Sequence, residues 1–444
     1  MGRCAVSTQK QKRPFALRAL AAFAGTLAIL FVLLLAAYAL PGERVRQHVY
    51  DSARTIQNEG LYPEYLGFKL FQMDNYTDTL MLFEAASADE LPPLQAMMTN
   101  TAYNVDNFET LADDLAWYIE KDWSTGAQRT DAPALEPFSY ARYWHGYLIW
   151  LRPLLLLMPY TGVRIVQYIV LFALLAVVLV QLRRRCGLRA AVWFAVSQLA
   201  VSVWFVPHQV QYFTCFMIAY AGCAWVLAKP RRSDVLCLGL LVLGTATAFC
   251  DLLVTPIITL GLPLTCWLLE PQQRLRGGVP QCALAVGGSL CWGTGYALCW
   301  AGKWALAGAV TDNNVLADAL HQAEVRTTAD TWHGMELTWR NIFIFLYDTL
   351  NSHHLFWPAL AVLAVLIALF ILSIRSKTAL VRALPLALTT CMTPAWFVLL
   401  RTHSIQHGWF TWRALGLTVF AGLAFLYYAC DLRAARRRLQ KGSI

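Results

Sequence analysis

Long apolar stretches separated by short polar segments recur along most of the 444-residue chain. A helix of about 20 apolar residues is long enough to cross the roughly 30 Å hydrocarbon core of a bilayer. Ten stretches approach this length, near residues 15–40, 163–182, 190–206, 210–228, 234–250, 252–269, 281–302, 355–374, 378–400 and 414–430. The pattern predicts an all-α, polytopic helical membrane protein with about ten transmembrane helices. The third stretch is short and the ninth contains Arg382, which leaves the count open by one or two.

A further apolar segment at 146–159 (GYLIWLRPLLLLMP) is too short to cross, and Arg152 followed by Pro153 interrupts its pattern. We expect an interfacial or re-entrant helix there. The expected division of the chain is a cytoplasmic tail at 1–14, a first transmembrane helix at 15–40, an extracytoplasmic helical loop at 41–160, a transmembrane bundle at 161–432 and a basic cytoplasmic tail at 433–444.

The predicted outer loop contains the main polar part of the chain, residues 41–145. Apolar residues recur there at spacings of three and four around 56–71, 77–86 and 107–119, which predicts short amphipathic helices lying on the bundle. Trp117, Trp123 and many Tyr and Phe residues argue against a disordered acidic loop.

The basic residues that flank the apolar stretches predict the orientation of the protein. If the spans alternate, these residues fall on one side: Arg3 to Arg18, Arg183 to Arg189, Lys229 to Arg232, Arg274 and Arg276, Arg375 and Lys377, and Arg433 to Lys441. We therefore expect a cell-membrane protein with both termini in the cytoplasm. Ala37-Tyr38-Ala39 resembles a signal-peptidase site, but a secretory apolar region has at most about 15 residues, so a retained first helix is favoured.

Composition narrows the class of protein. With 58% hydrophobic and 14% charged residues, the chain is not a soluble enzyme. The net charge of +9 arises mainly in the predicted cytoplasmic segments, where the acids are Asp234, Glu270 and Asp431. Topology and attraction to anionic membrane lipid account for this charge, so no nucleic-acid partner is expected.

Three acids on the predicted outer side are candidates for function. Asp74 and Asp78 lie four residues apart, so in a helix their carboxylates share one face. Neighbouring carboxylates raise one another's pKa, which suits a general base or a metal site. The alternative is that Asp78 caps a helix beginning at Thr79 and Asp74 is solvated. Asp251 lies at membrane depth between the fifth and sixth stretches, where a functional or salt-bridging role is expected.

Cations and histidines occur beside aromatic residues at the predicted outer ends of several spans. The candidates are Arg142, His145, Lys303, His403, His407 and Arg413. Such a cluster suits a lipid-linked phosphate or pyrophosphate, which needs N–H donors where water is scarce. The alternative is an aromatic belt with cations that reach the interface. His403 and His407 have metal-ligand spacing without a third ligand, so no metal or other cofactor is expected, with a divalent metal as the alternative.

The segments Asp74 to Asp78, Arg142 to Tyr147, Asp251 to Pro256, Gly295 to Trp304 and His403 to Arg413 resemble those of uncharacterised bacterial multi-span membrane proteins. The whole layout, an anchor helix, an acidic outer loop of short helices and a multi-span bundle, resembles the GT-C superfamily of glycosyltransferases. The resemblance implies that a sugar passes from a polyprenyl-phosphate carrier to a hydroxyl of a glycan or protein acceptor outside the membrane.

By this resemblance, Asp78 or Asp74 is the general base, the six cationic and histidine candidates bind the leaving phosphate, and Asp251 supports them. Many such enzymes carry the acid closer to the first span, so Asp51 is an alternative base. Other classes left open are a transporter or flippase of lipid-linked glycans, a glycan polymerase or ligase, and a noncatalytic scaffold. A flippase is expected to have charges inside its spans, and the apolar stretches here contain few.

Overall fold

The computed structural model describes residues 14–88, 90–103, 137–311, 313–328, 331–332 and 335–431. This part of the chain is almost entirely helical. Its strands form two short antiparallel pairs, β1 (Thr101–Tyr103) with β2 (Pro137–Ser139) and β3 (Thr331–Trp332) with β4 (Met335–Glu336). The all-α prediction is confirmed. The helix predicted at 107–119 and the tails at 1–13 and 433–444 lie outside the described residues.

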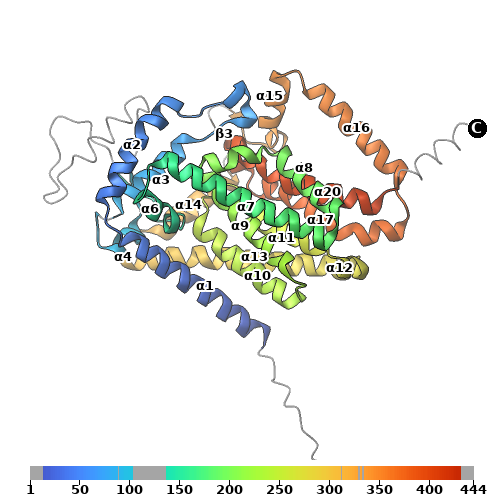
Figure 1. Cartoon of the computed structure of the whole chain (residues 1–444), viewed down its shortest axis with the longest axis horizontal. Helices are drawn as coiled ribbons and strands as arrows, with labels where there is room; N and C mark the ends of the chain where they lie inside the picture. The colour runs from blue at the N-terminus through green and yellow to red at the C-terminus, as the bar shows by residue number, and fades with distance from the viewer. Residues whose placement is uncertain are drawn as a thin grey trace, which may run out of the picture.

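Eight helices in the described part of the chain are long and apolar enough to cross a membrane (Figure 1). They are α1 (Phe15–Tyr38), α7 (Tyr160–Cys186), α9 (Val210–Ala228), α10 (Ser233–Cys250), α13 (Val279–Val310), α16 (Phe356–Ser373), α17 (Lys377–Leu399) and Gly408–Ala429, which ends in α20 (Leu415–Ala429). The other two predicted stretches form shorter apolar helices, α8 (Leu188–Ala200) and α11 (Ile257–Leu268). The chain is thus a polytopic helical protein.

Short helices follow α1, as predicted, but the first of them has other bounds. They are α2 (Glu43–Glu59), α3 (Asn75–Ser87) and α4 (Pro93–Thr99), with 3₁₀ turns η1 (Tyr65–Gly67) and η2 (Lys69–Phe71) between α2 and α3. The helix predicted at 56–71 is wrong, because α2 ends at Glu59. The next residue, Gly60, has a φ of 91° that does not continue a helix, and Pro63 follows soon after. The helix predicted at 77–86 lies within α3.

The apolar segment at 146–159 forms α6 (Leu148–Leu155), which is too short to cross a membrane. Arg152 on α6 is fully buried, and its guanidinium donates to the carbonyl oxygens of Ala85, at 2.5 Å, and Leu40, at 2.6 Å. This arginine therefore ties α6 to α3 and to the end of α1.

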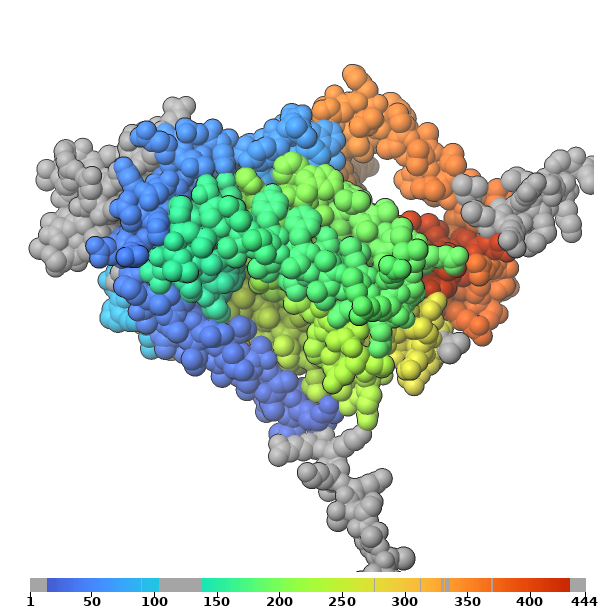
Figure 2. Space-filling view, in the orientation of Figure 1, coloured from blue at the N-terminus to red at the C-terminus, as the bar shows by residue number. Residues whose placement is uncertain are grey.

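The remaining described elements connect the long helices. They are η4 (Val203–His208), α12 (Pro271–Arg276), α14 (Val315–Thr328), η5 (Trp339–Asn341), α15 (Ile344–Ser352), α18 (Arg401–Gln406), α19 (Gly408–Thr411) and η6 (Trp412–Ala414). Figure 2 shows α16 standing apart from the bundle, and large apolar side chains along it, such as Val362 and Ile371, are exposed.

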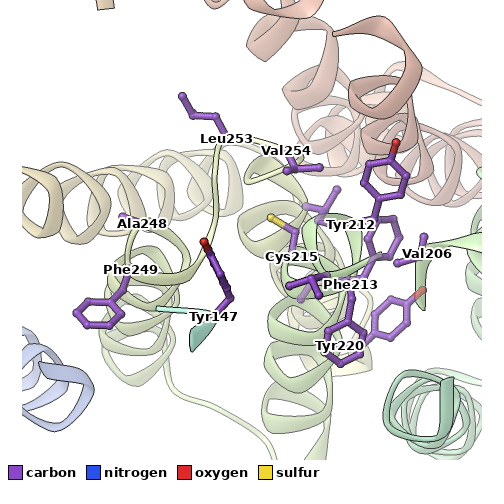
Figure 3. Close-up of a cluster of buried hydrophobic side chains, with 14 of the residues drawn as sticks. Tyr147, Val206, Tyr212, Phe213, Cys215, Tyr220, Ala248, Phe249, Leu253 and Val254 are labelled. Carbon is purple, nitrogen blue, oxygen red and sulfur yellow. The ribbon is translucent and has the colours of Figure 1, made fainter. Parts of the chain in front are cut away.

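Glycines allow the closest helix packing, between α10 and α13. A Cβ atom on Gly295 would lie 2.2 Å from the carbonyl oxygen of Leu241, and one on Gly244 would lie 2.0 Å from that of Trp292. Small residues of this kind let transmembrane backbones approach closely. Aromatic side chains of α9, including Tyr212 and Tyr220, fill the adjoining core (Figure 3).

The long helices run between two ends of the molecule. Helices α2, α3, α4 and α6 lie at one end, which we call the α3 end, and α12 lies at the other, the α12 end (Figure 1). Polar contacts join the flanking segments at the α12 end: Arg18 with Asp234, Arg185 with Glu270, Arg274 with Tyr428, and Arg375 with the carbonyl of Cys430. The structure thus gathers basic residues that the sequence predicts to be cytoplasmic.

Candidate functional site

Asp78 lies in the first turn of α3, with its side chain fully buried. The Tyr160 hydroxyl donates to its carboxylate, and so do the backbone N–H groups of Val210, at 3.3 Å, and Gln211, at 3.2 Å. Burial raises the pKa of Asp78 to about 7, although the hydrogen bond from Tyr160 and the charge of Arg164 lower it. Asp78 is therefore not the helix cap that was the alternative, and its pKa suits proton transfer near neutral pH.

Asp74 is the residue that caps α3. Its carboxylate accepts hydrogen bonds from the backbone N–H of Thr77, at 2.9 Å, and from the Thr77 hydroxyl, at 3.0 Å. The Trp409 indole and the Gln211 side chain lie close enough to lower the pKa of Asp74, but the larger effect of burial leaves it raised. Asp74 and Asp78 are thus both buried beside the start of α9.

Asp51 occupies a different environment. It lies on the exposed face of α2, where the amide of Gln47 donates to its carboxylate at 3.0 Å. A carboxylate on this exposed face has no shaped surroundings that would position an acceptor.

His403, His407 and Arg413 lie on α18, at its end and on η6, in the segment that also carries Trp409, a neighbour of Asp74. The two imidazole rings are 4.7 Å apart, and the ring of Trp409 is 5.3 Å from that of His407. Arg413 is buried, donates to the Trp409 carbonyl at 2.7 Å and lies over the ring of Tyr212 at 4.5 Å. The segment that follows α17 therefore brings three predicted phosphate-binding residues together near Asp74.

Both histidines are neutral at physiological pH. Burial lowers the pKa of His403 well below its usual range and that of His407 to about 4, and the nearby charge of Arg326 acts in the same direction. A neutral imidazole has one N–H donor and adds no positive charge. His403 donates its N–H to the Leu253 carbonyl, so only His407 keeps an N–H for an anion. Among the described residues no group of three or more His, Cys, Asp or Glu side chains is placed to hold a metal ion.

Asp251 supports this region through the backbone. Its carboxylate accepts the N–H of Val254 at 3.1 Å and closes a tight turn in which Leu253 has a φ of 67°. The Leu253 carbonyl in turn accepts a hydrogen bond from His403 at 2.9 Å. Burial raises the pKa of Asp251 to about 6, against hydrogen bonds from the Cys215 thiol and from the turn. Backbone amides, rather than an arginine, thus compensate this acid.

His145 forms a second buried cluster, with an acid that the sequence analysis missed. Its Nδ1 lies 2.7 Å from a carboxylate oxygen of Glu84 on α3, and Tyr147 donates to the same oxygen. The other carboxylate oxygen of Glu84 is buried and has no hydrogen-bond partner among the described residues. The available signal was an acid inside an apolar helical run, LMLFEAA at 80–86.

Lys303 on α13 is buried and uses its donors within the protein. Its ammonium donates to the carbonyl oxygens of Met97, at 2.7 Å, and Met98, at 3.3 Å, and to the Asn100 side chain at 2.6 Å. A lysine has three N–H donors, so none remains for a phosphate in this arrangement. Lys303 caps the end of α4 and joins it to α13.

Lys303→Met is expected to lower the free energy of unfolding by about 2–4 kcal/mol, since it leaves buried acceptors without a donor. Thermal unfolding in detergent, followed by tryptophan fluorescence, measures this loss. Lys377→Met, at an exposed position in the first turn of α17, is the matched control. Equal unfolding midpoints for the two variants would contradict the capping role.

Arg142 lines a cavity with a second arginine that the sequence analysis did not single out. This aromatic cavity has a volume of about 130 Å³ and lies between α13, α14 and the start of α18. Its walls are Arg142, Tyr143, Leu253, Tyr296, Trp300, Trp304, Ala319, Gln322, Ala323, Arg326, Thr327, Trp396 and Leu400. Arg142 pairs with Asp318 at 3.2 Å, and Arg326 donates to the Tyr143 hydroxyl at 2.7 Å.

The aromatic cavity adjoins the histidines. Leu253, which lines it, accepts the hydrogen bond from His403, and Arg326 is close enough to affect both imidazoles. Asp74 and Asp78 do not line the cavity. Comparison with protein-family models, curated proteins and solved structures finds no match to this chain.

Proposed function

We propose that the protein is a membrane glycosyltransferase that transfers a sugar from a polyprenyl-phosphate carrier to a glycan or protein acceptor on the extracytoplasmic side. The observation that carries the proposal is the aromatic cavity with two arginines, which adjoins His403 through Leu253. An aromatic wall suits prenyl groups, and guanidinium groups suit a phosphate.

In this proposal the carrier binds in the aromatic cavity, with its phosphate at Arg142 and Arg326. Each guanidinium keeps N–H groups beyond those it gives to Asp318 and Tyr143, because arginine has five donors. When the bond between sugar and phosphate breaks, these cations stabilise the charge that grows on the phosphate. Neutral His403 and His407 and the Arg413 guanidinium complete the polar wall toward Asp74.

The acceptor hydroxyl loses its proton to Asp78, with Asp74 as its partner or substitute. Support for Asp78 is its pKa of about 7, close to the value that a general base needs at neutral pH. Support for Asp74 is its position beside Trp409, whose ring contacts that of the half-exposed Tyr62. No metal or other cofactor enters this scheme.

We further propose that the α12 end faces the cytoplasm, with both termini on that side and ten crossings in all. The support is the cluster of basic residues that meet there, which matches the bias of cytoplasmic loops toward lysine and arginine. The α3 end, with its buried acids and the aromatic cavity, is then on the outer side.

Arg326→Gln is expected to raise the KM for a polyprenyl-phosphate sugar about tenfold or more, because a hydrogen bond to a charged group contributes about 1.5–3 kcal/mol. The assay follows release of polyprenyl phosphate from labelled carrier by the purified protein in lipid nanodiscs with a glycan acceptor. Arg340→Gln, at an exposed arginine of η5, is the control. Movement of the carrier across the bilayer without release of its sugar would overturn the proposal in favour of a transporter.

A further inference from the structure

A second cavity lies at the α12 end, away from the proposed transferase site. Its volume is about 250 Å³, whereas about 10–15 Å³ suffices for one water molecule. Helices α12, α13, α17 and α20 surround it. It is lined by Leu268, Gln273, Arg274, Gly277, Gln281, Arg375, Ala379, Arg382, Ala383, Pro385, Leu386 and Tyr428.

Three arginines face this cavity, and none of the described residues that line it is acidic. Arg274 donates one N–H to the Tyr428 hydroxyl, but its buried Nε–H has no hydrogen-bond partner among the described residues. Arg375 donates its Nε–H to the Cys430 carbonyl. The nearby acid Glu270 is paired with Arg185 at 2.8 Å and does not line the cavity. The positive charge facing the cavity is therefore not neutralised by a carboxylate in its wall.

The turn between α12 and α13 packs closely against the third arginine, Arg382. Gly277 has a φ of 24°, and a Cβ atom there would lie 3.2 Å from the Cβ and 3.1 Å from the Cγ of Arg382. A side chain at position 277 would therefore require Arg382 to shift by a few tenths of an ångström. Gln273 and Gln281 are both more than nine-tenths buried, and the Gln281 side-chain amide donates to the Gln273 side-chain oxygen at 3.2 Å.

Helix dipoles add to this positive field. Gln281 belongs to the first turn of α13, and Ala379 and Arg382 belong to the first two turns of α17. The cavity therefore lies beside the first turns of two long helices, where the helix dipoles are positive.

We propose that this cavity binds a phosphate group, with Arg274, Arg375 and Arg382 as its cationic ligands. The phosphate belongs either to the headgroup of an anionic phospholipid in the adjacent leaflet or to a soluble phosphate compound. Planar guanidinium groups match the oxygens of a phosphate, and basic pockets between transmembrane helices are suited to lipid headgroups. Leu268, Leu386 and Pro385 line the same cavity and supply apolar contacts for the rest of a lipid.

The test measures retention of phosphatidylglycerol by the full-length protein in detergent micelles, using native mass spectrometry. The expected result is that the wild type retains phosphatidylglycerol in preference to phosphatidylcholine. Arg382→Gln is expected to weaken retention about fivefold, and Arg274→Gln combined with Arg382→Gln by more, since each basic residue near a lipid surface contributes about 1 kcal/mol. Arg382 is exposed, so its single variant tests binding in a protein that folds.

Arg183→Gln combined with Arg184→Gln is the matched control, because both arginines are exposed at the end of α7 and the net charge falls equally. Stabilisation of the wild type by millimolar inorganic phosphate, lost in the Arg382 variant, would identify the soluble source. Equal losses of lipid in the cavity variants and the control, or no response to either probe, would overturn the site. The readout is binding, so it is independent of any glycosyl transfer.

Discussion

Asp78→Asn is expected to reduce sugar transfer by about 100- to 10,000-fold, the range in which a general base contributes to catalysis. Asparagine keeps the size of the side chain. Its carbonyl oxygen can accept the Gln211 N–H, and its amide can donate to the Tyr160 hydroxyl. The protein should therefore remain folded. Release of polyprenyl phosphate, measured in nanodiscs at equal amounts of monodisperse protein, checks the loss.

Asp51→Asn is the matched control, because it changes the same chemical group on the exposed face of α2. It is expected to retain full activity. Asp74→Asn is expected to lower activity as well, since Asp74 both caps α3 and lies beside Asp78. Full transfer by the Asp74 and Asp78 variants together with loss in the Asp51 variant would show that the base lies on α2.

The pKa of Asp78 also determines two dependences on pH. As a base it must be ionised, so transfer should rise about tenfold per pH unit up to about pH 7 and then level off. Stability should change in the opposite direction. The folded carboxyl holds its proton up to about pH 7 but the unfolded one loses it near its ordinary value of 3.8, so the folded state is favoured at low pH and loses this advantage as the pH rises from about 4 to 7. Asp78→Asn should remove this part of the pH dependence of the unfolding midpoint.

Gly295→Leu is expected to prevent assembly of the helical bundle. A Cβ atom at this position would meet the Leu241 carbonyl oxygen at 2.2 Å and the Thr245 hydroxyl at 2.9 Å, so α10 and α13 would have to separate. Gly295→Ala already forces such a shift, and overpacking of this kind typically costs about 1–3 kcal/mol. The fraction of protein that elutes as a single peak in detergent, together with its unfolding midpoint, measures both losses.

Gly293 provides the control on the same helix. It lies two residues away on α13, and a Cβ atom there would have no neighbour within 4 Å. Gly293→Ala should be neutral or stabilising, because alanine is the better helix former by about 1 kcal/mol. Unfolding midpoints that fall equally in the Gly293 and Gly295 alanine variants would show that the contact between α10 and α13 is not the cause.

The sequence alone was sufficient to predict the class of fold. Each of the ten predicted apolar stretches contains a helix, and eight of these helices are long enough to span a membrane. Such helices depend on the local run of apolar residues, because a helix satisfies its own backbone hydrogen bonds in lipid. The prediction from local spacing was wrong at α2. Apolar spacing predicted a helix over 56–71, but the helix ends where the chain turns at Gly60.

The sequence also indicated candidate acids and cations on the predicted outer side, but only the tertiary structure decided which residues they contact. Asp78 accepts a hydrogen bond from Tyr160, 82 positions away, and the Glu84 carboxylate on α3 contacts His145 in the segment before α6. Arg326 donates to the Tyr143 hydroxyl because α14 packs beside Tyr143, whereas the Lys303 ammonium donates to carbonyl oxygens at the end of α4. Burial and the orientation of distant side chains set these contacts and the resulting pKa values, and neither is encoded in the local spacing of residues.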